Sequence, residues 1–313
     1  MKIIFFGSSH FAVASLQALI KSKDEVICVV TQPDKQKGRH LQLAGTDVKS
    51  VALGAKLKIF QPENIESKES LIFLKSMEAD VFVIVAYGQI LSQEVLDIPK
   101  IMPMNIHASL LPRYRGAAPI NWAVINAEKK TGITVIFVTA KMDAGPIIMQ
   151  EEIKIEDQDT SVTLEEKLRK CGAKLLIEAL GCIDKRDYRL VEQEEEGVIY
   201  APKLKKEIGL IDWSTPAVNI HNQVRGLLPW PGAFSSYCGK MLKIFHSEVF
   251  PVFPNHKPLC GEVVRADKHG IVVACGRGFL KVNELQLEAG KRMNAQSFII
   301  GHKLTVGEVL GKK

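Results

Sequence analysis

The chain has 313 residues, of which 46% are hydrophobic and 24% are charged, a composition typical of a globular protein with a sizeable core. Its apolar runs stay below the ~18 residues that a membrane-spanning helix needs, and the N-terminus leads into a short strand instead of a signal peptide, so we expect a cytoplasmic protein. Its six scattered cysteines form no Cys-x-x-Cys pair, so their spacing predicts neither a zinc site nor a disulfide framework.

The net charge of +6 is unevenly distributed along the chain. Residues 203–313 carry 16 Lys and Arg against 8 Asp and Glu, whereas residues 1–202 carry 25 against 27. A basic C-terminal third beside a near-neutral body indicates a polyanionic partner for that third. Charge alone fits a solvated basic surface without a partner equally well.

The first 190 residues alternate between predicted strands and helices, the pattern of an α/β fold with a mainly parallel sheet. Strands are expected at residues 2–6, 25–31, 58–60, 80–86, 131–138 and 146–155, and helices at about 9–21, 47–53, 67–77, 118–127 and 160–180. The opening strand and turn lack the second and third glycines of a dinucleotide-binding fingerprint, so a dinucleotide site is not predicted. The strand at 80–86 is continuously apolar, which is typical of a strand covered on both faces.

Two polar residues end another apolar run, at Asn105 and His107. If the chain is still extended there, both side chains project to the same face. An amide that never ionises beside an imidazole is suited to a carbonyl that becomes an oxyanion. Asp143 follows in a turn beyond the strand at 131–138. On these residues alone, a core histidine and a plain turn remain open alternatives.

The run Asn-x-His-x-Ser-Leu-Leu-Pro-x-Tyr-Arg-Gly-Ala-x-Pro at 105–119, with an Asp-x-Gly turn at 143–145, resembles the signature of the folate-dependent formyltransferases. The resemblance extends from Phe6 to about Met293. It implies a Rossmann-like formyltransferase domain followed by a small OB-like β-barrel. It also implies an enzyme that transfers a formyl group from 10-formyltetrahydrofolate to the α-amine of methionyl initiator tRNA, for translation initiation, without a metal.

The resemblance also implies roles for particular residues. Asn105 is expected to donate to the oxyanion, His107 to stabilise the tetrahedral intermediate and move its proton, and Asp143 to orient the imidazole. The residues expected to contact folate are Tyr87, Gly88, Gln89, Ile90, Leu91, Ser109, Leu110, Leu111 and Pro112. The residues expected to contact tRNA are Lys35, Lys37, Arg39 and Lys243.

The C-terminal third reads as a separate domain. Short strands expected at 235–237, 242–248, 261–266, 270–274 and 280–287 predict a small β-barrel. An acidic, unpatterned stretch at 192–197 is a good linker candidate. We therefore expect a catalytic domain at 1–190, a linker at 191–206 and a tRNA-binding domain at 207–313.

Three other functions share parts of this pattern. A formyltransferase acting on a small amine and a formyltetrahydrofolate hydrolase would use the same three catalytic residues, but neither needs a basic barrel. An RNA-binding protein that lost its activity would not need Asn105, His107 and Asp143. No heptad or exposed apolar repeat is present, so we expect a monomer.

Overall fold

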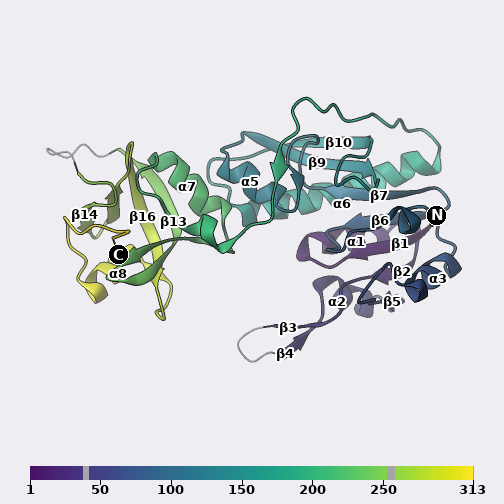
Figure 1. The fold of residues 1–313 in the computed structure, drawn as a ribbon, viewed down its shortest axis with the longest axis horizontal. Helices are drawn as coiled ribbons and strands as arrows, with labels where there is room; N and C mark the ends of the chain where they lie inside the picture. The colour runs from purple at the N-terminus through teal and green to yellow at the C-terminus, as the bar shows by residue number, and fades with distance from the viewer. Residues whose placement is uncertain (38–41, 252–257, 313) are drawn as a thin grey trace. The chain divides into compact units, whose positions relative to one another are not determined.

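The computed structural model describes residues 1–37, 42–251 and 258–312 (Figure 1). The chain forms two compact units. Unit 1 comprises Met1–Pro119, Lys130–Lys154 and Glu165–Ala201, and unit 2 comprises Ile120–Lys129, Ile155–Leu164 and Pro202–Lys313. This division differs from the expected domain boundaries, because two short segments of the first half join the C-terminal unit and the expected linker is divided after residue 201.

Unit 1 is built on a seven-stranded sheet with the order β10-β9-β7-β6-β1-β2-β5. The parallel strands are β1 (Lys2–Gly7), β2 (Glu25–Val30), β5 (Ile59–Phe60), β6 (Val81–Val85) and β7 (Met102–His107). The antiparallel strands at one edge are β9 (Lys130–Phe137) and β10 (Ile147–Lys154). Every residue of β6 is buried, which agrees with its continuous apolar run. The predicted mainly parallel α/β sheet is confirmed.

Ser8 connects three strand ends at the carboxyl edge of this sheet. Its hydroxyl donates to the carbonyl oxygen of Tyr87 (2.9 Å) and accepts from the backbone N–H of Gln32 (3.1 Å). The preceding residue, Gly7, is closely packed, since a Cβ there would lie 2.9 Å from the side chain of Ala12. The sheet edge at which open α/β folds bind ligands is therefore held in one arrangement.

The helices of unit 1 are α1 (His10–Ile20), α2 (Asp47–Gly54), α3 (Lys68–Ser76), the short α4 (Gln93–Leu96) and most of α6 (Ser161–Asp184). Two of them, α2 and α3, start at side-chain caps. The Thr46 hydroxyl accepts from the N–H of Lys49 (3.0 Å), and the Ser67 hydroxyl accepts from the N–H of Ser70 (3.2 Å). These bonds satisfy backbone donors that the first turn of a helix leaves unpaired.

A two-stranded hairpin occupies the place where the sequence predicts a polar loop. In it, β3 (Lys35–Lys37) pairs antiparallel with β4 (Gln42–Ala44). Arg39 lies outside the described residues, as does the side chain of Lys37. The loop prediction was wrong for β3 because its polar sequence has no apolar alternation, and backbone pairing alone produces the strand.

Unit 2 contains an antiparallel sheet with the order β12-β13-β16-β15-β14, and β17 pairs with β16. The strands are β12 (Ala233–Tyr237), β13 (Lys240–Phe250), β14 (Val263–Asp267), β15 (Gly270–Ala274), β16 (Phe279–Leu287) and β17 (Met293–Asn294). Along β12 buried and half-buried residues alternate, the pattern of a sheet packed on one face. The predicted C-terminal domain of short antiparallel strands is confirmed.

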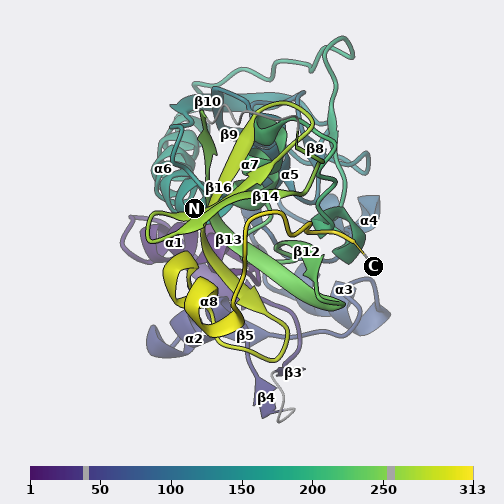
Figure 2. The same cartoon turned by 90° about the vertical axis from the view of Figure 1, so that its left-hand side faces the viewer.

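Helices cover the apolar face of this sheet. They are the 3₁₀ turn η1 (Lys206–Gly209), α7 (Ala217–Gly226) and α8 (Ala295–His302). Helix α5 (Pro119–Ile125) also lies nearly all in unit 2. Helix α8 (Figure 2) was not predicted from the sequence, and it contacts β15 and β16. Asn294 caps it by accepting from the N–H of Ser297 (2.8 Å). Phe298 is fully buried and packs edge-on to Tyr237, with ring centroids 5.8 Å apart.

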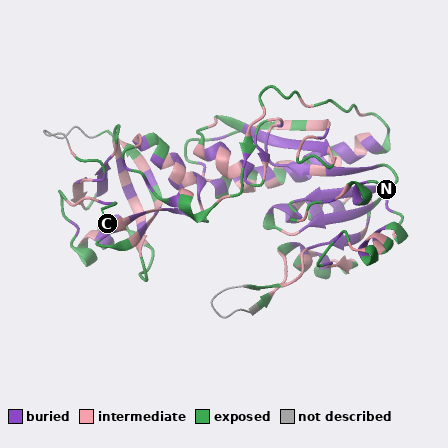
Figure 3. Cartoon of the chain, viewed as in Figure 1, coloured by how far each residue is buried: buried purple, intermediate pink, exposed green. Residues whose placement is uncertain are grey.

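Exposure varies sharply along the chain (Figure 3). Buried residues gather in the central strands of each unit, whereas the β3–β4 hairpin and the segment that follows α6 are largely exposed. That segment ends at β11 (Tyr200–Ala201), which pairs in parallel with β8 (Arg115–Gly116). Within the described part of the chain, every helix is too short or too polar to cross a membrane.

Candidate active site

Strand β7 carries Asn105 and His107 on one face, because they lie two residues apart on an extended chain. His107 is 6% exposed, and its Nε2 lies 2.9 Å from the carbonyl oxygen of Tyr114. A carbonyl can only accept, so Nε2 carries a proton and Nδ1 is the basic atom of the neutral ring. Asn105 is half-buried, and its amide makes no hydrogen bond to another described residue.

Asp143 lies in the turn after β9 and faces His107. Its Oδ1 is 3.6 Å from Nδ1 of His107, and its Oδ2 accepts from the backbone N–H of Gly116 at 2.9 Å. The Asp143 side chain is 17% exposed, and its φ of +48° lies in the left-handed region that residues other than glycine seldom adopt. The structure thus brings Asp143 and His107 together at the carboxyl end of β7.

Gly145 lets this turn close tightly against β9. A Cβ on Gly145 would lie 1.8 Å from the carbonyl oxygen of Phe137, so no other residue fits without moving the backbone. The N–H of Phe137 donates to the carbonyl oxygen of Pro146 at 2.9 Å and completes the closure. The position of Asp143 therefore depends on backbone geometry as well as on its own carboxylate contacts.

A cavity of about 270 Å³ opens beside Asn105 and Asp143. Its lining is mainly apolar and comes from the ends of several strands and the loops that follow them. The lining residues are Ile84, Gln89, Ile90, Leu91, Asn105, Ile136, Val138, Thr139, Ala140, Lys141, Met142 and Asp143. An apolar cavity with a few convergent polar groups is the usual form of a small-molecule site.

The residues expected to contact folate divide into two groups. Gln89, Ile90 and Leu91 line this cavity. Tyr87 and Gly88 do not line it, and the Tyr87 side chain is 2% exposed and packs against an aromatic ring of β1. Burial raises the pKa of the Tyr87 hydroxyl well above its usual value. The Tyr87 side chain is therefore not placed to meet a ligand in this cavity.

Residues 109–112, the other segment expected to contact folate, support the loop that follows them. They do not line the cavity. The Thr134 hydroxyl donates to the carbonyl oxygen of Ser109 (2.6 Å) and accepts from the N–H of Leu111 (3.1 Å). Gln150 donates to the carbonyl oxygen of Leu111 (2.9 Å). These bonds fix the loop whose continuation presents the Tyr114 carbonyl to His107.

The described cations expected to contact tRNA lie on the two units separately. Lys35 is exposed on β3 of unit 1, and Lys243 is half-buried on β13 of unit 2. At the base of the hairpin, the ammonium group of Lys49 lies 2.7 Å from the carboxylate of Asp34. Hydrogen bonds from Lys49 and Gln61 lower the pKa of Asp34. The base of the hairpin therefore contains the ion pair between Lys49 and Asp34, and Lys35 takes no part in that pair.

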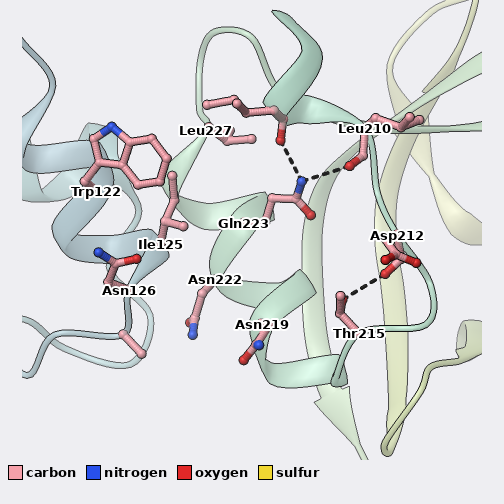
Figure 4. A pocket seen from close by; sticks show the side chains of 12 residues that line it. Trp122, Ile125, Asn126, Leu210, Asp212, Thr215, Asn219, Asn222, Gln223 and Leu227 are labelled. Carbon is pink, nitrogen blue, oxygen red and sulfur yellow. Dashed lines mark hydrogen bonds between the residues drawn. The ribbon is translucent and has the colours of Figure 1, made fainter. Parts of the chain in front are cut away.

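A larger cavity, of about 520 Å³, lies in unit 2 between α5 and α7 (Figure 4). Amide side chains line much of it, and Gln223 is held by bonds from its Nε2 to the carbonyl oxygens of Ile208 (2.7 Å) and Leu210 (3.2 Å). Its one carboxylate, Asp212, accepts from Ser214, which lowers the pKa of Asp212. This cavity holds no histidine or acid–base pair, so its size does not mark it as a reaction centre.

Three groups that hold the site were not predicted as site residues. The carbonyl of Tyr114 and the N–H of Gly116 lie within the 105–119 motif, so the motif carried a signal for them. Gln193 donates from Nε2 to the carbonyl oxygens of Asp143 and Gly145, at 2.8 Å each. It lies in the unpatterned acidic stretch, where the sequence offers no signal.

Two family models match this chain. Residues 1–180 match the formyl transferase domain, and residues 203–303 match the formyl transferase C-terminal domain. The chain therefore belongs to the formyl transferase family. Among the described residues, no group of three or more His, Cys, Asp or Glu side chains is arranged to hold a metal ion.

Individual relatives extend this likeness to the whole chain. The sequence is 43% identical over 312 residues to a methionyl-tRNA formyltransferase of Acetivibrio thermocellus, covering 100% of both chains. It is 43% identical over 311 residues to that of Caldanaerobacter subterraneus subsp. tengcongensis, covering 99% of this chain and 100% of the other. The fold resembles that of WlaRD, a sugar 3N-formyl transferase crystallised in the presence of dTDP and 5-N-formyl-THF. In that comparison the TM-score is 0.66 at 21% identity, covering 90% of this chain and 97% of the other.

Proposed function

We propose that this protein transfers a formyl group from 10-formyltetrahydrofolate to the α-amine of methionine attached to initiator tRNA. Its full-length similarity to methionyl-tRNA formyltransferases supports the reaction and both substrates. The observation that carries the proposal is the carboxylate–imidazole pair of Asp143 and His107 beside Asn105, at the end of one parallel strand. These three residues supply the acid–base pair and the hydrogen-bond donor that acyl transfer to an amine needs.

The reaction forms a bond between the amine nitrogen and the formyl carbon and breaks the bond from that carbon to N10 of the folate. The amine loses a proton, and N10 gains one. An α-amino group has a pKa of about 7.7–8.0, so a useful fraction is neutral near pH 7 without a strong base. No covalent bond to the protein is needed.

Asn105 donates a hydrogen bond from its amide to the formyl oxygen as negative charge develops there. The amide is suited to this because it lines the cavity and no other described residue occupies it. The proton of the attacking amine passes to the pair formed by Asp143 and His107. Asp143 lines the cavity, and Nδ1 of His107 lies 3.6 Å from its Oδ1, so the carboxylate stabilises the positive charge of an imidazole that takes up the proton.

Folate binds against the apolar wall that Gln89, Ile90 and Leu91 provide, with backbone contacts from Tyr87 and Gly88. The segment at 109–112 contributes by holding the loop in place. The Gln89 side chain supports its own loop, since it accepts from the N–H of Ile65 at 3.0 Å and therefore presents a fixed backbone to the cavity.

The basic C-terminal unit binds the tRNA, with Lys243 as one phosphate contact. The β3–β4 hairpin supplies Lys35, Lys37 and Arg39 as further contacts. Salt-dependent neutralisation of phosphates by such cations provides most of the sequence-independent affinity of proteins for nucleic acids. We propose that the protein acts as a monomer in the cytoplasm, where aminoacylated initiator tRNA is used.

The proposal is tested by measuring formyl transfer from 10-formyltetrahydrofolate to methionyl initiator tRNA, free methionine, a panel of small amines and water. The His107→Ala variant serves as the control for the site. We expect transfer with the aminoacylated initiator tRNA alone, and its loss in the variant. Folate turnover with a small amine or water as the acceptor would retain the catalytic site and reject the tRNA substrate.

A further inference from the structure

The segment of residues 191–201, here called the strap, is bound to the candidate active site at both ends. At one end Val191 and Ile147 exchange two backbone hydrogen bonds, of 2.7 and 2.9 Å. At the other end the Ala201 carbonyl accepts from the N–H groups of Ala117 (2.9 Å) and Ala118 (3.2 Å). The sequence predicts a linker here, yet these bonds lie within unit 1. The strap is therefore attached to the two chain segments that carry the site.

Gln193, the third residue of the strap, holds the Asp143 turn. Its Nε2 donates to the carbonyl oxygens of Asp143 and Gly145, at 2.8 Å each, and its Oε1 accepts from Nε of Arg115 at 3.0 Å. These partners settle the orientation of the amide, because the carbonyls need a donor and the guanidinium needs an acceptor. One side chain thus spans the turn that carries Asp143 and the strand that follows Tyr114.

Arg115 provides a second set of contacts that holds the strap in place. Its side chain is 1% exposed, and its Nη1 and Nη2 have no hydrogen-bond partner among the described residues. A buried cation is costly unless polar groups surround it, and the strap provides Gln193 together with Glu195, whose Oε1 lies 3.7 Å from Nη1. Glu195 also pairs with Lys141 at 3.1 Å, and Lys141 first and then Arg115 lower its pKa.

We propose that Gln193 is a positioning residue of the formyl-transfer site, which makes the strap a working part of that site. It sets the distance between the Asp143 carboxylate and Nδ1 of His107 by holding the carbonyl groups of Asp143 and Gly145 within the turn. The catalytic part of this inference rests on the proposed function, whereas the geometric part rests on the contacts of Gln193. The turn needs such an anchor because Asp143 adopts a left-handed φ of +48°.

The test compares Gln193→Ala, Gln193→Met and Gln193→Glu with a matched control on the same strap, Glu194→Ala. Glu194 is exposed and has none of these bonds. Methionine keeps the length and volume of glutamine but neither polar atom, whereas glutamate keeps the acceptor for Arg115 and loses the donor to both carbonyls. Displacement of a reacting group by about 1 Å can cost about 10²-fold in rate, so we expect kcat to fall about tenfold to hundredfold in all three Gln193 variants.

The KM for 10-formyltetrahydrofolate should change little, because the part of the wall formed by Gln89, Ile90 and Leu91 has no contact with Gln193. A loss confined to kcat is the signature of a group that acts on the reacting geometry. The control should keep wild-type kcat. If Gln193→Ala folds poorly, the Gln193→Met variant decides the outcome, with kcat expressed per folded molecule. A Gln193→Met protein with wild-type kcat, or a loss that matches the unfolded fraction, overturns the proposal.

A second measurement does not depend on turnover. The ¹⁵N resonances of the His107 imidazole report the environment of Nδ1, and they should move in Gln193→Met and stay in place in Glu194→Ala. If the wild-type protein transfers no formyl group, the proposed function fails, and these resonances alone then decide the positioning role. Unmoved His107 signals in Gln193→Met would overturn it.

Discussion

Two sheltered histidines, one in each unit, have opposite surroundings. His107 in unit 1 stands 3.6 Å from a carboxylate oxygen of Asp143 and beside a cavity that Asp143 lines. His221 on α7 of unit 2 lines a cavity of about 470 Å³, but its Nδ1 meets a hydroxyl, that of Ser247, at 3.1 Å. Both histidines are therefore sheltered beside or within a cavity, and what distinguishes His107 is that its Nδ1 faces a carboxylate, whereas Nδ1 of His221 faces a hydroxyl.

Electrostatics reinforce this difference. Burial first, and then the positive charge of Arg225 and the neighbouring His246, lower the pKa of His221 to about 4. His221 is therefore neutral at pH 7 and serves packing and a hydrogen bond. The protonation of a buried histidine therefore depends on its burial as well as on the charges around it, and cavity size does not reveal it.

The largest expected difference is between the effects on kcat of substituting these two histidines. Replacement of a general acid–base group typically costs about 10²–10⁴-fold, so His107→Asn should lose that much kcat whereas His221→Asn should keep wild-type kcat at pH 7. Steady-state formyl transfer to methionyl initiator tRNA measures both. Equal losses in the two variants would remove the distinction drawn between them.

The next effect concerns two amides, one in the cavity of each unit. Asn105→Ala should lower kcat about 10²-fold, because it removes the donor to the developing oxyanion. Asn219→Ala, at an exposed amide lining the larger cavity of unit 2, should leave kcat unchanged. The same assay with saturating substrates checks this pair. Near-normal turnover of Asn105→Ala would assign the oxyanion to another group.

A pH effect on stability should appear in unit 2. The folded-state pKa of His221, about 4, lies below its ordinary value of 6.5, so the unfolded chain binds a proton more readily between these values. The contribution of His221 is present above pH 6.5 and is lost as the pH falls towards 4. After discounting for partial exposure, we expect about 1–2 kcal/mol of lost unfolding free energy.

The three tryptophans, Trp122, Trp213 and Trp230, all lie in unit 2, so their fluorescence during urea unfolding follows that unit. The His221→Asn variant should show a smaller fall in stability between pH 7 and pH 4 than the wild type. The same pH dependence in both proteins would mean that other groups cause it.

The smallest effect is on tRNA affinity. Removing one phosphate contact should reduce the slope of log affinity against log salt by about 0.7–0.9, so Lys243→Ala and Lys35→Ala should each flatten it slightly. Lys100→Ala, an exposed lysine paired with Glu78 at 3.4 Å, is the matched control and should leave the slope unchanged. Slopes that match the wild type in both test variants would place the tRNA elsewhere.

The amino-acid sequence by itself determined the fold class of each unit and the part of the site that β7 provides. Apolar runs marked β6 and β7, because a strand buried on both faces is apolar along its length, and a series of short predicted strands marked the sheet of unit 2. The two-residue spacing of Asn105 and His107 set a shared face as soon as β7 was extended. The helices expected at about 47–53 and 67–77 form as α2 and α3, and Thr46 and Ser67 cap them, since a cap acts within four residues.

The tertiary structure decided which segments far apart in the chain come into contact. The approach of Asp143 to His107 depends on the antiparallel pairing of β9 with β7, and Gln193 reaches the Asp143 turn from 50 residues away. The β3–β4 hairpin and the strap likewise depend on backbone pairing that leaves no periodic trace in polar sequence. Hydrogen bonds between segments far apart in the chain obey no local pattern, so these contacts could be read only from the folded molecule.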